Sequence, residues 1–180
     1  QSYVAQFAVR PGSRAVIFAN NDSAYEAAQV MAEAGVEIAA LVDVRMQPDL
    51  RAVHGLDVRC GQAVVAARGG KRVVAADIAS IDAATGEIAG AIETIACDLL
   101  CVSGGWDPAV HLFSQSGGRL AYDDVQHCFV PGAAVQPTHA AGAANGAFML
   151  ADCVAQGRAV GAQAAQDAGL ASACHIEGGI

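Results

Sequence analysis

The first third of the chain alternates short apolar runs with polar turns in the order of a β-α-β unit. The run Ala15–Ala19 predicts a buried parallel strand, because strands that are covered on both faces are continuously apolar. After a polar turn, Ala24–Ala34 predicts a helix that ends before Gly35. A second apolar strand, Val36–Val42, then ends in Asp43. The pattern therefore predicts an α/β fold with a parallel sheet.

This layout is that of a dinucleotide-binding unit, in which an acid about 20 residues beyond the turn binds a ribose. The glycines of such a turn are replaced here by Ala19, Asn21 and Ala24. Asn21 is the most serious change, because the middle glycine lets the backbone approach the pyrophosphate. Asp22 adds a negative charge at the helix N-terminus, where a phosphate would lie. We expect a turn that keeps the fold but has lost ordinary pyrophosphate binding.

Two sets of residues near this turn allow alternative interpretations. Asp22 or Ser23 can serve simply as the helix cap, since both residue types are preferred there. Asp43 can hold a ribose while Arg45 meets a 2′-phosphate, or the two can form an ordinary ion pair in solvent at the strand end.

The middle of the chain predicts short strands that form an antiparallel meander. Gly69-Gly70 and Thr85-Gly86 supply the turns between them. The predicted elements are a helix at Pro48–His54 and strands at Leu56–Arg59, Ala63–Ala67, Arg72–Ile78, Glu87–Ile95 and Cys97–Val102, the last one buried. The meander would then be the crossover between the third and fourth parallel strands.

The last third predicts a separate unit that ends in a long helix. Gly157 and Gly161 lie inside this helix, and because glycine weakens a helix interior we expect them to allow a close neighbour. The predicted elements are a short helix at Pro108–Phe113, strands near Arg119–Tyr122 and Cys128–Val130, a strand-to-helix turn at Thr138–Gly146, and a helix at Ala147–Ala168.

The composition of the chain argues against several classes of function. The chain is 54% hydrophobic and 16% charged, and its net charge is −8. Without a basic cluster or an apolar run of about 20 residues, we expect neither nucleic acid nor membrane as a partner, and a cytoplasmic location. The six cysteines form no C-x-x-C pair, so we expect reduced structural thiols, with Cys97 and Cys101 pointing the same way. Neither a catalytic group nor a metal site is predicted.

Several motifs in combination resemble a known family. They are Phe18–Tyr25, Val102–Pro108, His111–Gly118, Phe129–Gly132 and Ala141–Gly146. The chain resembles the α subunits of heterotetrameric sarcosine oxidase, within the two-dinucleotide-domain flavoproteins of the glutathione reductase type. The resemblance covers about residues 8 to 170. Subunits of opine oxidase and hydrogen cyanide synthase share this architecture and remain alternatives.

The resemblance implies a piece of a longer subunit. Residues 1–10 would lead into an inserted NAD-binding-like Rossmann domain at residues 11–103, whose crossover is the antiparallel meander. Residues 104–170 would form the C-terminal part of an FAD/NAD-type dinucleotide domain, with the long helix, and residues 171–180 a tail.

The resemblance also implies cofactors and partners. In the family, sarcosine is oxidised at FAD on the β subunit, FMN lies at the α/β interface, and the α subunit holds NAD while the one-carbon unit passes to tetrahydrofolate. Ala143 replaces the acid that contacts FAD in the wider flavoprotein pattern, which agrees with NAD in its place. The candidate NAD-binding residues are Gly104, Gly105, Gly142, Ala143, Ala144 and Asp43. Their small side chains can equally serve tight packing alone.

Three classes of function follow from these observations. The first is a dinucleotide-associated, non-catalytic part of an amine oxidase subunit, with the β subunit as its chief partner. The second is a self-contained NAD-dependent reductase, which the lost glycines disfavour. The third is a purely structural, degenerate Rossmann domain. If residues 104–170 belong to a domain whose other half is missing, we expect the isolated chain to self-associate.

Overall fold

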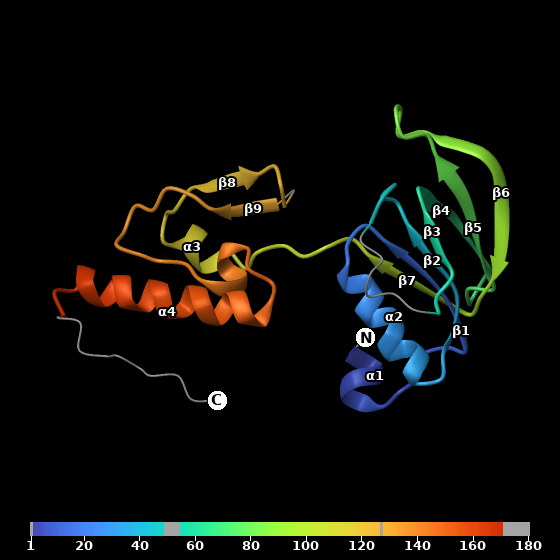
Figure 1. Cartoon of the computed structure of the whole chain (residues 1–180), viewed down its shortest axis with the longest axis horizontal. Coiled ribbons are helices and arrows are strands. Elements are labelled where there is room, and N and C mark those ends of the chain that lie inside the picture. The colour runs from blue at the N-terminus through green and yellow to red at the C-terminus, as the bar shows by residue number, and fades with distance from the viewer. Residues whose placement is uncertain (1, 49–54, 127, 171–180) are drawn as a thin grey trace. The chain divides into compact units, whose positions relative to one another are not determined.

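The computed structural model describes residues 2–48, 55–126 and 128–170. The chain divides into two compact units, Gln1–Gly105 and Trp106–Ile180. Figure 1 labels the elements of each unit. The predicted helix at Pro48–His54 and the predicted tail at residues 171–180 lie outside the described residues, apart from Pro48.

The first unit is built on a parallel sheet in the strand order β3-β2-β1-β7. Its strands are β1 (Arg14–Ala19), β2 (Glu37–Asp43), β3 (Val58–Cys60) and β7 (Leu99–Ser103). β1 pairs with β2 on one side and with β7 on the other, parallel in both cases. The α/β fold with a parallel sheet, predicted from the apolar runs, is therefore confirmed.

One face of this sheet is covered by helix α2 (Ser23–Glu33). Tyr25, Ala28 and Met31 of the helix pack with inward-facing residues of β1 such as Ile17. These side chains follow one another at intervals of three residues, close to the period of a helix, so they form one buried stripe of α2. A short helix not predicted from the sequence, α1 (Ser2–Phe7), adds Val4 to the edge of this cluster.

The other face is covered by the antiparallel meander (Figure 1). Its strands are β4 (Gln62–Arg68), β5 (Ala75–Ile81) and β6 (Ile88–Ala96), paired in the order β4-β5-β6. Ala76 and Ile78 of β5 pack with Val16 and Val42 of the parallel sheet. The predicted meander crossover therefore forms and supplies the second half of the core.

Two expectations about the strand after the meander were wrong. β7 is only partly buried, and Val102 is 69% exposed. Cys97 packs with the meander-side cluster, whereas Cys101 packs with the α2-side cluster. The physical reason is Asp98: its carboxylate accepts hydrogen bonds from the backbone N–H groups of Ser13 and Arg14. The chain bends there, so Cys97 precedes the strand and lies outside its two-residue alternation.

The second unit contains a hairpin, a short helix and a long helix. Its elements are α3 (His111–Gln115), β8 (Leu120–Asp123), β9 (Cys128–Pro131), the 3₁₀ turn η1 (Gly142–Asn145) and α4 (Leu150–Asp167). β8 and β9 pair antiparallel, as expected from the sequence. α4 begins at Leu150 and not at Ala147, because Met149 has extended backbone angles. Among the described residues, no helix is long and apolar enough to cross a membrane.

Candidate dinucleotide site

The carboxyl edge of the parallel sheet is where an open α/β sheet binds its ligand. The strand order turns back at β1, because β2 and β3 lie on one side of it and β7 on the other. Ligands in such sheets bind at this switch point, beyond the carboxyl ends of the strands. Here the turn after β1 and the residues after β7 meet at that position.

Side-chain amides connect this turn to the end of β7. The Asn21 amide donates to the carbonyl oxygen of Ser103 at 3.2 Å and to its hydroxyl at 2.9 Å. The Asn20 amide donates to the carbonyl oxygen of Gly104 at 3.2 Å, and the Ser23 hydroxyl donates to Asn21 Oδ1. Asn21 therefore replaces the missing glycine with a side chain that ties two strand ends together.

The acid at the end of β2 is fully buried and hydrogen-bonded within its own chain. Asp43 has an exposed fraction of 0%. Its Oδ2 accepts the Tyr25 hydroxyl at 2.6 Å and Arg45 Nη2 at 2.8 Å, and its Oδ1 accepts the Arg45 backbone N–H at 2.8 Å and Nε at 3.1 Å. The ion pair of Asp43 with Arg45 that the sequence allowed is present, but it is buried on the Asp43 side.

The same guanidinium reaches the start of α2. Arg45 Nη2 donates to Asp22 Oδ1 at 2.7 Å. Asp22 occupies the N-cap position of α2 but makes no side-chain capping bond. The helix-cap interpretation of Asp22 is therefore wrong, because its carboxylate is drawn to Arg45.

Ionisation in this cluster follows from these contacts. Burial alone would raise the pKa of Asp43, but the hydrogen bonds from Arg45 and Tyr25 lower that pKa below its ordinary value. Burial and the neighbouring Asp43 carboxylate raise the pKa of Tyr25. The hydrogen bonds to Asp43, and then to Asp22, raise the pKa of Arg45. At neutral pH Asp43 is therefore a carboxylate, Arg45 a guanidinium and Tyr25 a neutral phenol.

Gly104 and Gly105, which follow β7, are the last two residues of the first unit. Gly105 has a φ of +103°, a backbone conformation that favours glycine, and Gly104 has no atom within 4 Å of the position of an added Cβ. Both glycines are exposed. Their assignment as ligand-binding residues stays a prediction, and their exposed backbone supports it.

The remaining predicted residues lie together in the second unit, just before α4. Gly142 has a φ of +66°, a backbone conformation that strongly favours glycine, although an added Cβ would meet Cys153 Sγ only at the ordinary contact distance of 3.5 Å. The Gly142 N–H donates to Oε1 of Gln156 at 3.0 Å. Ala143 is exposed, and its carbonyl oxygen accepts the Ala109 N–H at 3.2 Å. Helix α4 thus holds the turn through one glutamine, which no sequence motif singled out.

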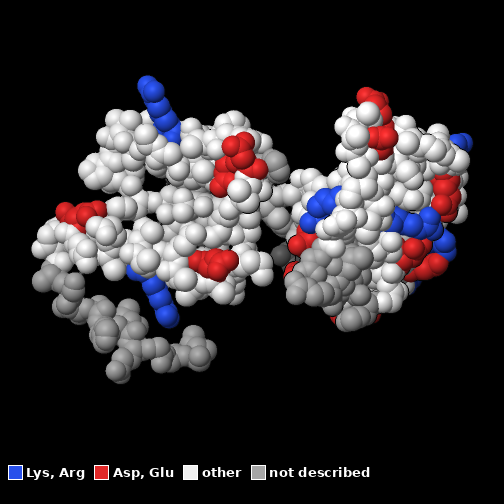
Figure 2. Space-filling model, turned by 45° about the horizontal axis from the view of Figure 1, so that its top comes forward, with Lys and Arg blue, Asp and Glu red and all other residues white. Residues whose placement is uncertain are grey.

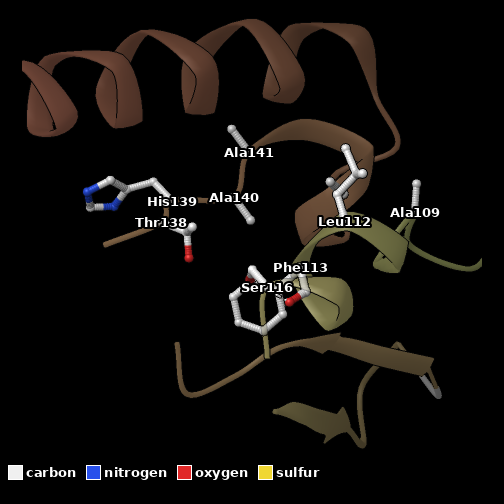
Figure 3. A pocket seen from close by; sticks show the side chains of 9 residues that line it. Ala109, Leu112, Phe113, Ser116, Thr138, His139, Ala140 and Ala141 are labelled. Atoms are coloured by element: carbon white, nitrogen blue, oxygen red, sulfur yellow. Dashed lines mark hydrogen bonds between the residues drawn. The ribbon is translucent and has the colours of Figure 1, made fainter. Parts of the chain in front are cut away.

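A pocket of about 330 Å³ opens beside this turn (Figure 3). The His139 ring lies at one end of it and Ala109 at the other, with Ala140 and Ala141 between them. Its walls are mostly apolar, with hydroxyl groups from two residues. The lining residues are Ala109, Leu112, Phe113, Ser116, Thr138, His139, Ala140, Ala141 and Ala144. The predicted residue Ala144 therefore lines a real cavity.

The side chain of His139 is tied to the end of α4. His139 Nε2 lies 2.7 Å from Asp167 Oδ2, and Gln163 donates to the other oxygen of Asp167 at 2.8 Å. Gln163 and Asp167 are four residues apart and therefore share one side of α4, but this spacing does not show that His139 lies against them. Within the described residues, no group of three or more His, Cys, Asp or Glu side chains is arranged to hold a metal ion.

Comparison with known proteins supports the resemblance seen in the motifs. The chain is 35% identical over 174 residues to a sarcosine oxidase subunit alpha of Corynebacterium sp. (strain P-1), and 30% identical over 177 residues to that of Rhizobium meliloti (strain 1021). The resemblance to sarcosine oxidase α subunits is confirmed. Each match covers 94% of this chain, but the chain spans only 18% and 16% of those relatives. No family model matches the chain.

Solved structures with the same fold include two thioredoxin reductases. The chain matches the enzyme of T. acidophilum with a TM-score of 0.61 at 19% identity, covering 90% of this chain and 54% of that one. It matches the enzyme of Lactococcus lactis with a TM-score of 0.61 at 18% identity, covering 92% of this chain and 55% of that one. At this identity the likeness establishes the fold, which is the one that the resemblance implied.

Proposed function

We propose that this chain is the part of a sarcosine oxidase α subunit that contains an inserted Rossmann-like unit, followed by the closing part of a dinucleotide domain. In this proposal the parent enzyme demethylates sarcosine to glycine at flavins, FAD and FMN, held on or with the β subunit. The chain itself is a non-catalytic scaffold associated with NAD. The relatives named as α subunits carry this proposal.

The turn before α4 is the proposed place of contact with NAD. Gly142 turns the backbone in a conformation that side chains rarely adopt and begins the 3₁₀ turn η1, and helix α4 follows from Leu150 onward. Such a glycine-containing turn before a helix exposes backbone N–H groups to an anion. Ala143 adds no charge there, so a pyrophosphate meets no repulsion at this position. Gly104 and Gly105 are proposed as a second stretch of backbone in contact with NAD.

The alternative of a structural domain without nucleotide rests on one observation. Gln156 already binds the N–H of Gly142, so part of the polar backbone of the turn is satisfied without a ligand. Opine oxidase and hydrogen cyanide synthase subunits remain alternatives for the identity of the parent enzyme, because the chain itself shows no amine-binding group.

The test measures how much NAD is bound to the purified polypeptide. The polypeptide used contains these 180 residues and any residues encoded on either side of them. We expect about one NAD per polypeptide after denaturation and chromatography. Ala143→Asp should lower that content at least tenfold, because the carboxylate repels the pyrophosphate. Ala155→Asp is the matched control, since it puts the same charge at an exposed position of α4. Polypeptide without NAD, or equal loss in both variants, would favour the structural domain.

The 180-residue chain alone should not oxidise sarcosine. Its sequence contains no G-x-G-x-x-G flavin fingerprint. Oxygen consumption of the purified chain with sarcosine, FAD and FMN should equal the flavin-only background. Turnover above that background would show that the chemistry resides in this chain and that the scaffold proposal is wrong.

A further inference from the structure

Side-chain hydrogen bonds and ion pairs connect the turn after β1 to the ends of both neighbouring strands, β7 and β2. On the β7 side of the turn, Asn21 binds Ser103 through two hydrogen bonds. On the β2 side, Arg45 joins Asp22 to Asp43, and Tyr25 binds the same Asp43. The two sets of contacts flank the turn after β1.

These contacts use the groups that a dinucleotide would need. A ribose at this edge requires free oxygens on the acid that ends β2. Both oxygens of Asp43 already accept hydrogen bonds, and its side chain is fully buried. A pyrophosphate requires an approach to the helix N-terminus without a competing negative charge, yet the Asp22 carboxylate lies there.

We infer that Arg45 is a built-in substitute for a nucleotide, so that the turn after β1 and the end of β2 are closed by their own side chains and bind no dinucleotide. Its guanidinium balances the two carboxylates, and its planar shape contacts both at once. In this view Arg45 and Asn21 are the residues that determine specificity, because they exclude nucleotide from a sheet whose topology would accept one. This inference does not depend on where the parent subunit holds NAD.

The experiment is hydrogen exchange of the 180-residue chain, followed by mass spectrometry, with and without 5 mM NAD or ADP. We expect neither nucleotide to change exchange in residues 20–25 or 42–46 of the wild-type protein. Arg45→Gln should speed exchange in both segments at least tenfold, and neither nucleotide should reverse it. Protection of the wild-type turn by NAD or ADP would overturn the inference.

A matched control separates the proposed role from general loss of charge. Arg59 also contacts two carboxylates, those of Asp57 and Glu93, but on β3 and away from the turn. Arg59→Gln should leave exchange at residues 20–25 unchanged. If Arg45→Gln does not fold, Asp22→Asn removes only the exposed contact and should still speed exchange in residues 20–25 severalfold. Unchanged exchange there in the variant that folds would show that Arg45 does not hold the turn.

Discussion

The guanidinium of Arg45 contacts carboxylates from two different elements. Asp22 belongs to the turn before α2 and Asp43 to the end of β2. The Asp22 side chain is 65% exposed, whereas Asp43 is inaccessible to solvent. Exposed ion pairs contribute little to stability, but removing one partner of a buried pair leaves an uncompensated charge. The contact with Asp43 should therefore dominate the energetics of this edge.

This difference gives a prediction for Asp43→Asn at neutral pH. The substitution removes the negative charge and leaves Arg45 without its buried partner, so we expect the free energy of unfolding to fall by about 2 kcal/mol. Asp22→Asn is the control, with an expected loss below about 1 kcal/mol. Urea unfolding followed by circular dichroism measures both. Equal losses would contradict the dominance of the buried contact.

The same pair gives a prediction for pH. The pKa of Asp43 is lower in the folded protein than its ordinary value, so the carboxylate stabilises the fold fully above the unfolded pKa, about 3.9. This contribution is lost as pH falls through the lower folded pKa. Wild-type protein should therefore lose stability more steeply below about pH 4 than Asp43→Asn. Parallel pH profiles of the two proteins from pH 7 to 2.5 would refute the assignment.

Sequence reasoning could place Asp43 and Arg45 at a strand end but could not choose between a ligand site and an ion pair. The choice depends on Tyr25, whose hydroxyl reaches Asp43 across 18 residues of sequence. The structure places Tyr25 on the buried face of α2, and helical spacing does not reveal which residue its hydroxyl contacts. Contacts between side chains on different elements depend on packing, and a single sequence does not encode them in any local pattern.

At the scale of elements, apolar runs and glycine turns were sufficient to predict β1, α2, β2 and the meander. The prediction failed at two boundaries between elements. Asp98 bends the chain before β7, and the extended backbone of Met149 delays the start of α4 by about one turn. Local polar contacts such as those of Asp98 compete with the regular pattern that periodicity detects.

The two glycines inside helix α4 allow a test of whether another element packs closely against this helix in a longer protein. Neither Gly157 nor Gly161 has an atom within 4 Å of the position of an added Cβ. The close packing expected at these glycines is therefore absent from the described residues. Because alanine favours a helix by up to about 1 kcal/mol over glycine, Gly157→Ala and Gly161→Ala should each stabilise the 180-residue chain.

The same two substitutions should behave differently in the longer parent subunit, if another element packs on α4 there. In that context an added methyl group would meet the neighbour and cancel or reverse the gain. Thermal unfolding of both proteins measures the difference. Gly142→Ala is the control, because its positive φ makes the substitution unfavourable in either context. A stabilising effect of Gly157→Ala of equal size in both would show that no element packs there.

At the scale of the whole chain, the two units differ in how their apolar residues are covered. The first unit buries two clusters, one on each face of its sheet. The second unit leaves large apolar side chains in solvent, and the 18-residue helix α4 has no buried residue. Figure 2 shows few charged side chains among the uncharged atoms of the visible face of this unit, at the left. Among the most exposed are Leu112, Val125, Val135 and Leu150.

This exposure predicts that the isolated chain associates with itself. Contiguous apolar surface beyond a few hundred Å² usually finds a partner, and the free chain offers only its own copies. We expect light scattering at tens of micromolar to show species larger than a monomer. The double variant Leu112→Lys and Leu150→Lys should shift the population toward monomer, because each substitution replaces an exposed large apolar side chain of the second unit with a charge. Ile92→Lys, at an apolar position of the first unit that is also exposed, should not. A strictly monomeric wild-type chain with a cooperative melt would show that the second unit is complete without a partner.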